Sequence, residues 1–139
     1  MHSNKTIIGR LNNIYSKIPN FDCQHCHECE GPIIWFKPEE INIREYLHKN
    51  NLEYIIWSTE EFEKHNMKCP YLKNDRCSIY PVRPIVCRLQ GNIRELPCKF
   101  NKNNLINDEK YHEIKNEFNS LLKDIDAFNI CYSTRRHSL

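Results

Sequence analysis

Three cysteines fall within seven residues, in the stretch CQHCHEC, and their spacing is C-x2-C-x2-C at Cys23, Cys26 and Cys29. A thiolate is a soft ligand that suits Zn, Cu(I) and iron–sulfur clusters, and it suits Mg or Ca poorly. Two cysteines separated by two residues in the chain can both bind the same metal centre. The stretch is therefore a candidate metal-binding loop.

A second group of cysteines follows in CPYLKNDRCSIYPVRPIVCRL, at Cys69, Cys77 and Cys87. Structural zinc usually takes its four ligands as two pairs from two loops. Bacterial-type ferredoxins instead hold a [4Fe–4S] cluster with three cysteines of one loop and a distant cysteine that precedes a proline, as Cys69 precedes Pro70. Six candidate ligands exceed the four of a single zinc, which favours a polynuclear cluster or two sites. The predicted ligands are Cys23, Cys26, Cys29, Cys69, Cys77 and Cys87.

Two arginines, Arg83 and Arg88, flank Cys87. Several thiolates carry substantial negative charge, and a nearby cation would stabilise them and tune the site. We expect both arginines to act on the bound cofactor, the alternative being two solvated side chains.

The remaining soft ligands are weaker candidates. His25 and His27 lie between thiolates on a tight loop, where side chains tend to point to solvent. Cys98 is left open as a ligand, and Cys131 is expected to be a core or surface thiol.

Taken in order, these motifs resemble the YkgJ-type cysteine-cluster family, a zinc- or iron-chelating CxxCxxCC domain. That pattern runs C-x2-C-x2-C-C, then C-P-F/Y-L, C-S-I-Y and R-P-x-x-C-R, and the chain matches it over about residues 14–100. The segment FKPEE at 36–40 also resembles the family. One position departs from the pattern, because Glu30 stands where the family has the second cysteine of a doublet. The resemblance implies a metal and does not imply a reaction.

The bulk composition is that of one soluble domain spanning residues 1–139, with 40% hydrophobic and 27% charged residues. A net charge of +2 is too small to argue for nucleic acid or an anionic membrane as a partner. The N-terminus lacks an apolar signal region, and no stretch is long enough for a membrane helix, so we expect a cytoplasmic protein. In that reducing compartment cysteines act as metal ligands more readily than as disulfides, whereas export would favour four disulfides.

Apolar periodicity predicts the elements around the cysteines. A helical stripe runs from Ile7 to Ile18 and should end at Pro19; another helix is expected over about 107–128. Between them we expect a strand at 33–36, followed by a helix that begins at Pro38 and buries Ile41, Tyr46 and Leu47. After this helix we expect a β-rich segment at 52–57. A capping box at Ser58–Glu61 should then start a short helix. Residues 69–98 look irregular. The predicted fold is mainly α with an irregular metal-stabilised centre, and a small α+β fold is the alternative.

Three functions fit these features. The first is an iron–sulfur protein of [4Fe–4S] type that acts in electron or sulfur transfer, or in chemistry at the cluster, with an unidentified redox or protein partner. The second is a zinc-stabilised module that binds a protein or nucleic acid. The third is a protein that carries or stores zinc or iron. Outside the cysteines the sequence contains no catalytic constellation, so it does not decide whether the chain is an enzyme.

The role of Glu30 gives a first prediction. Adjacent residues seldom aim at one centre, so Glu30→Gln should leave metal content unchanged, as should Cys131→Ser. Cys26→Ser and Cys87→Ser should lower metal content sharply, because each removes a thiolate ligand. Elemental analysis of the purified variants measures this. Loss of metal in a folded Glu30→Gln protein at neutral pH would show that the carboxylate is a ligand.

Overall fold

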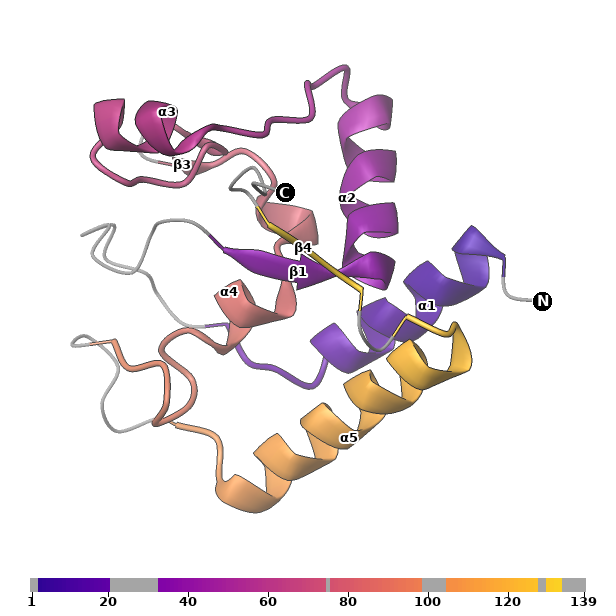
Figure 1. Cartoon of the computed structure of the whole chain (residues 1–139). Coiled ribbons are helices and arrows are strands. Elements are labelled where there is room, and N and C mark those ends of the chain that lie inside the picture. The colour runs from indigo at the N-terminus through magenta and orange to yellow at the C-terminus, as the bar shows by residue number, and fades with distance from the viewer. Residues whose placement is uncertain (1–2, 21–32, 75, 99–104, 128–129, 134–139) are drawn as a thin grey trace.

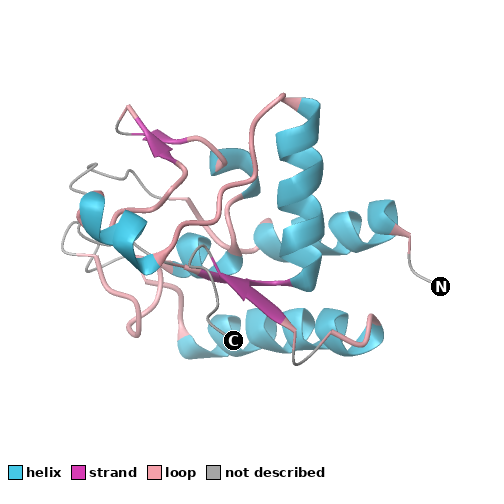
Figure 2. Ribbon diagram, turned by 45° about the horizontal axis from the view of Figure 1, so that its top comes forward, coloured by secondary structure: helices cyan, strands magenta, loops and turns pink. Residues whose placement is uncertain are grey.

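The fold is described from a computed structural model of the 139-residue chain, which describes residues 3–20, 33–74, 76–98, 105–127 and 130–133 (Figure 1). Helices dominate, as predicted, and two small antiparallel sheets join them (Figure 2). In chain order the elements are α1 (Asn4–Tyr15), β1 (Ile34–Phe36), α2 (Lys37–Lys49), α3 (Thr59–Lys64), β2 (Leu72–Lys73), β3 (Arg76–Cys77), the 3-10 turn η1 (Tyr80–Val82), α4 (Ile85–Leu89), α5 (Asp108–Asp124) and β4 (Cys131–Ser133).

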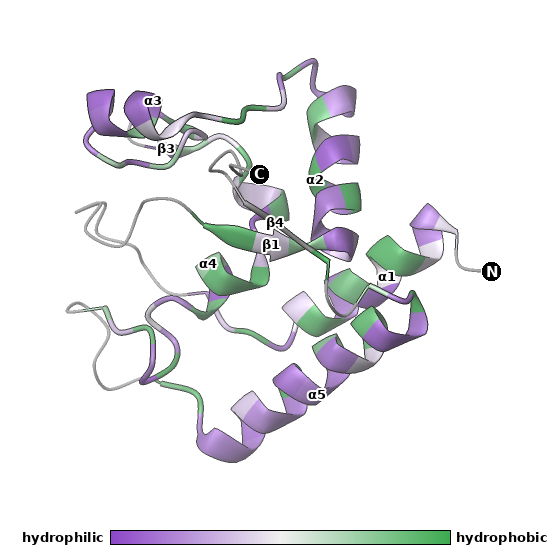
Figure 3. Cartoon of the chain, viewed as in Figure 1, coloured by the Kyte–Doolittle hydropathy of each residue, from purple (hydrophilic) through white to green (hydrophobic). Residues whose placement is uncertain are grey.

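The two long terminal helices, α1 and α5, pack together and confirm the predicted amphipathic stripes (Figure 1). Asn107 caps the start of α5 by accepting a hydrogen bond from the Lys110 amide at 2.7 Å. Helix α1 ends at Tyr15, earlier than Pro19 requires, and the Ser16 hydroxyl donates to a carbonyl of its last turn. In Figure 3 the apolar faces of both helices turn inward. This first core comprises Leu11, Ile14, Tyr15, Ile18, Leu89, Ile93, Ile114, Phe118, Leu121 and Leu122.

A second core lies between β1, α2 and the segment that carries Cys69 and Cys77. Trp35 of β1 is fully buried in it, and β1 pairs with β4 in antiparallel register. The other buried members are Ile43, Leu47, Tyr71, Ile79 and Val82. The two cores together account for most of the buried apolar side chains in the described residues. No helix in the described ranges is long and apolar enough to cross a membrane.

Two details of this region differ from the sequence-based expectations. Leu47 is buried as predicted, but Ile41 and Tyr46 are only partly buried. The buried face of α2 instead follows the four-residue spacing of Glu39, Ile43 and Leu47. Residues 52–56 form no strand and Trp57 makes a single bridge; the Ile55 amide donates to the Tyr71 hydroxyl at 2.9 Å. The capping box of α3, in contrast, is confirmed at Ser58 and Glu61.

Glu39, in the first turn of α2, is fully buried between the two cores. One of its carboxylate oxygens accepts from the Tyr15 hydroxyl of α1 and from the Ile85 amide of α4, both at 2.5 Å. The other accepts from the Phe36 amide at 3.2 Å. Burial raises the pKa of Glu39 to about 7, although the three donors and the Arg88 guanidinium act in the opposite direction. This one carboxyl group therefore connects α1, β1, α2 and α4.

Replacing Glu39 should test that connection. Glu39→Gln keeps the shape but turns an amide N–H toward at least one donor, so the free energy of unfolding should fall by about 1–3 kcal/mol. Urea denaturation at matched metal content and about pH 8 measures it. The control is Glu45→Gln, which removes only the exposed ion pair with Lys49 and should change stability by less than about 0.5 kcal/mol. Equal effects of the two substitutions would contradict the role given to Glu39.

Candidate metal centre

A tight hairpin places Cys69 and Cys77 on neighbouring chain segments. Strands β2 and β3 pair with Leu72 opposite Cys77, and the Leu72 amide donates to the Cys69 carbonyl at 3.1 Å. At the turn Asn74 adopts a left-handed conformation with φ 51°, which asparagine tolerates better than most residues. Below the hairpin the Ser78 amide and hydroxyl both donate to the Tyr71 carbonyl at 2.7 Å. Both cysteines pack against the second core.

Cys87 reaches the same region from the short helix α4. Pro84 is the N-cap of this helix, and the Cys87 amide donates to its carbonyl at 3.0 Å. The first residue of the helix, Ile85, is bound to the buried Glu39, and Leu89 at the other end joins the first core. The helix is thus fixed at both ends, and its cysteine is partly buried.

Cys69 and Cys77 lie near enough to Cys87 to affect its ionisation. The pKa of the Cys87 thiol lies well above its usual range, first because of burial and then because of the nearby Cys69, Cys77 and Glu39. Arg83 acts in the opposite direction and favours the thiolate. A hairpin and a helix thus place three of the six predicted ligands within electrostatic range of Cys87, and sulfur donors of this kind fit zinc or iron.

The described cysteines do not close a site by themselves. Within the described ranges, no group of three or more His, Cys, Asp or Glu side chains is placed to hold a metal ion. The other three predicted ligands, Cys23, Cys26 and Cys29, lie outside the described residues, as do His25, His27 and Glu30. The six-cysteine ligand set thus stays a prediction.

The two arginines make different contacts. The Arg83 guanidinium lies 3.8 Å from the centre of the exposed Tyr80 ring and donates to the Asn20 side chain at 2.6 Å. Arg88 donates to the carbonyls of Arg83 at 2.8 Å and Pro81 at 3.0 Å. Its guanidinium also covers the Tyr15 ring, with 3.7 Å to the centroid. These contacts give Arg88 a structural role, and its predicted action on the cofactor stays a prediction.

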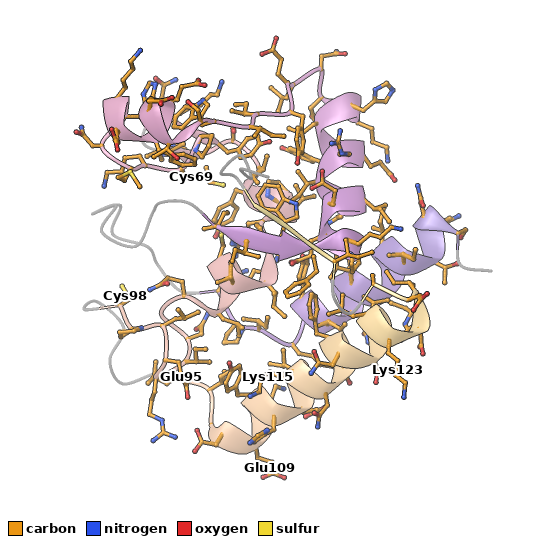
Figure 4. All side chains as sticks on the ribbon, viewed as in Figure 1. Cys69, Glu95, Cys98, Glu109, Lys115 and Lys123 are labelled. Carbon is orange, nitrogen blue, oxygen red and sulfur yellow. The ribbon has the colours of Figure 1, made fainter. Side chains whose placement is uncertain are left out.

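Cys98 and Cys131 lie on other segments. Figure 4 shows Cys69 beside α3 and Cys98 on the separate loop that follows α4. That loop is held by Gln90, whose side-chain amide donates to the Pro97 carbonyl at 2.9 Å. Cys131 begins β4, and its backbone pairs with Phe36. Neither residue is assigned to the candidate centre.

Sequence reasoning missed the group that supports the centre. Glu39 and Glu40 lie in the first turn of α2 and both are buried, which no spacing in the sequence indicates. Glu40 accepts hydrogen bonds from the Trp35 indole, from Arg44 at 2.7 Å and from Tyr54 at 3.3 Å. The one available signal was FKPEE, which resembles the family although it contains no metal ligand.

The raised pKa of Cys87 predicts pH-dependent metal uptake. The metal-free thiol is protonated at neutral pH, and a metal binds the thiolate, so binding must displace this proton. Below the thiol pKa, affinity should therefore rise with pH, by about tenfold per pH unit for each displaced proton. Competition with a chromophoric chelator between about pH 6 and pH 8 measures it. Cys87→Ser should release one proton fewer per bound metal, whereas Cys131→Ser should match the unsubstituted chain. An affinity independent of pH would contradict ligation by these thiols.

Comparison with known proteins agrees with the geometry. Residues 22–120 match the CxxCxxCC family, which is described as a "putative zinc- or iron-chelating domain". The match begins just before Cys23 and runs into α5, so it contains all six predicted ligands. Neither the curated proteins nor the solved structures contain a match to this chain. Because the family match covers most of the sequence, the chain belongs to the CxxCxxCC family of zinc- or iron-chelating domains.

Proposed function

We propose that the chain holds an iron–sulfur cluster of [4Fe–4S] type and acts in electron or sulfur transfer. The observation that supports this most directly is the convergence of Cys69, Cys77 and Cys87 from two separate segments. With the C-x2-C-x2-C loop, the chain offers more sulfur ligands than the four of one zinc. A number of sulfur ligands above four fits a polynuclear cluster better than a single metal ion.

The protein's own residues would supply three things to such a centre. The cysteines bind it as thiolates, and Arg83 offsets part of their negative charge. Tyr71, which is 1% exposed, packs in the second core beside Cys69 and Cys77 and keeps water from that side. A cluster held in this way supplies one-electron redox chemistry.

One side of the centre is more open. Tyr80 is 48% exposed and carries the Arg83 guanidinium on its ring. An aromatic ring paired with a cation is a suitable contact surface for a redox or protein partner.

Metal and sulfide analysis tests the proposal. Protein made and purified without oxygen should be brown, with broad visible absorption that dithionite bleaches, and should contain iron and acid-labile sulfide. Cys69→Ser and Cys87→Ser should lower both contents together, while Cys131→Ser serves as the matched cysteine control. A colourless protein with one equivalent of zinc and no sulfide would exclude the cluster and leave the zinc-stabilised module.

A further inference from the structure

Glu40, in the first turn of α2, accepts hydrogen bonds from two oxidisable aromatic side chains. It is 5% exposed, and its Oε2 accepts from the Trp35 indole N–H and from the Tyr54 hydroxyl, the latter at 3.3 Å. Its Oε1 accepts from the Arg44 guanidinium at 2.7 Å. These three partners are all donors, so both carboxylate oxygens act as acceptors. One buried oxygen atom therefore lies within hydrogen-bond reach of an indole and of a phenol.

A carboxylate at this position can take up a proton as well as accept a hydrogen bond. A neutral carbonyl oxygen would satisfy the Trp35 N–H at a lower cost of burial. An indole or a phenol that loses one electron becomes strongly acidic, however, and a base within hydrogen-bond reach can remove its proton. Burial and the hydrogen bond to Glu40 raise the pKa of Tyr54, so this phenol keeps its proton until an electron leaves. Glu40 therefore suits both rings to one-electron oxidation coupled to proton transfer.

Tyr71 connects these residues to the cysteine hairpin. Its ring centre lies 6.5 Å from that of the fully buried Trp35, within the range of a direct aromatic pair. Cys69 stands two residues before Tyr71 and packs against the second core, to which both rings belong. Burial is the main cause of the raised pKa of Tyr71, and the nearby Glu40 and Cys69 add to it. The series that begins beside Cys69 thus continues through two rings to Glu40.

The other end of the series reaches the surface at Tyr54. Its side chain is partly exposed, and the Arg44 guanidinium lies 3.9 Å from the centre of its ring. The Arg44 side chain is itself 57% exposed, whereas Trp35 is fully buried. A small molecule in solution can therefore reach Tyr54 but not Trp35.

We propose that Trp35, Glu40 and Tyr54 form a proton-coupled relay that returns an electron, by way of Tyr71, to oxidised sulfur at Cys69. A one-electron oxidant that takes an electron from the Cys69 thiolate leaves a thiyl radical. Trp35 gives this sulfur an electron through the Tyr71 ring, which restores the thiolate, and the indole N–H proton passes to Glu40. Tyr54 then gives an electron to the Trp35 radical and its own proton to Glu40, while Glu40 returns the first proton to the indole.

The cycle closes at the surface. A small one-electron reductant in solution, such as a soluble thiolate, gives an electron to the Tyr54 phenoxyl radical, whose oxygen takes back the proton held on Glu40. One electron has then moved from the reductant to the oxidant, and every protein group is restored. Sulfur that is not repaired is oxidised further, to sulfinic and sulfonic acids that do not readily revert. The relay uses no bound metal and goes beyond the proposed cluster, so the metal-free chain tests it.

Laser photoionisation tests the relay in the reduced, metal-free full chain. The pulse ejects an electron from an indole whether or not the ring is buried, and a scavenger removes that electron. The chain contains two tryptophans, and Trp57→Phe leaves Trp35 as the source of the signal. Trp57 stacks on His65 and has no hydrogen bond to a carboxylate among the described residues. In this parent variant the indole-radical absorption should decay as a tyrosyl-radical absorption rises, at a rate independent of protein concentration and slower in deuterium oxide.

Tyr54→Phe, added to the Trp57→Phe parent, keeps the ring and removes the phenol O–H. It should lose the tyrosyl absorption and prolong the life of the indole radical. Tyr71 cannot replace it, because its hydroxyl donates to the Ile55 carbonyl at 3.4 Å, which does not take up a proton. The matched control is Tyr46→Phe, which should behave as the parent does. Tyr46 is also partly buried against the second core, but its hydroxyl has no hydrogen bond to any described residue.

The sulfur end of the relay is tested by steady oxidation. The metal-free chains are exposed to a photogenerated ruthenium(III) complex, and mass spectrometry measures the fraction of each cysteine that has become sulfinic or sulfonic acid. Tyr54→Phe should raise that fraction severalfold at Cys69 relative to Tyr46→Phe. Cys98, on the separate loop after α4 (Figure 4), is the internal control and should not change. Equal oxidation of Cys69 in the two variants would overturn the link to sulfur.

The remaining outcomes decide the relay itself. A tyrosyl signal that survives Tyr54→Phe, or that Tyr46→Phe removes to the same extent, overturns it. Should Trp57→Phe not fold, the two tyrosine variants are compared in the chain with both tryptophans, where Tyr54→Phe should remove part of the signal. Should Tyr54→Phe not fold, the rate in deuterium oxide decides, and an unchanged rate overturns the proton-coupled step. Iron and sulfide content tests the proposed function separately, so one proposal can fail without the other.

Discussion

The fold depends on one buried carboxylate. Glu39 receives hydrogen bonds from Tyr15, Phe36 and Ile85, which belong to α1, the end of β1 and the start of α4. A carboxyl group without such donors would be costly to bury, whereas one with three donors holds its neighbours in fixed positions. Because α4 carries Cys87, the position of this predicted ligand depends on an acid far away in the sequence.

The two hydrophobic cores support different cysteine-bearing segments. The second core supports Cys69 and Cys77, and the first core holds the far end of α4 through Leu89. The position of Cys87 relative to the other two cysteines therefore depends on how the two cores pack, and Glu39 is buried between them. The described segments around Cys69, Cys77 and Cys87 contain two-residue strands, one 3-10 turn and a five-residue helix. Segments so short bury little apolar surface, so a bound metal would contribute directly to their stability.

The elements that were predicted correctly are those that apolar periodicity and short-range side-chain contacts determine. The stripes of α1 and α5, the first turn of α2 and the capping box of α3 all depend on residues within a few positions of one another. The burial of Glu39 was not predicted, because its donors Tyr15 and Ile85 lie 24 and 46 residues away and no local pattern reveals them. Likewise, the order of the motifs identified the family, but the spacing of the cysteines in the sequence cannot show which of them lie close together in the fold. The convergence of Cys87 with the hairpin follows from tertiary packing.

Charge balance links the buried carboxylate to the cysteines. Glu39 and the three cysteines lie close enough that the acid and the neighbouring sulfurs raise the pKa of Cys87. The nearby cations act against this: Arg83 favours the Cys87 thiolate, and Arg88 favours ionised Glu39. With burial and these neighbours the metal-free Cys87 thiol stays protonated at neutral pH, so a metal that bound its sulfur would have to displace that proton. Glu39 therefore has two effects on α4: it binds the backbone at Ile85, and it raises the pKa of the thiol that the same helix carries.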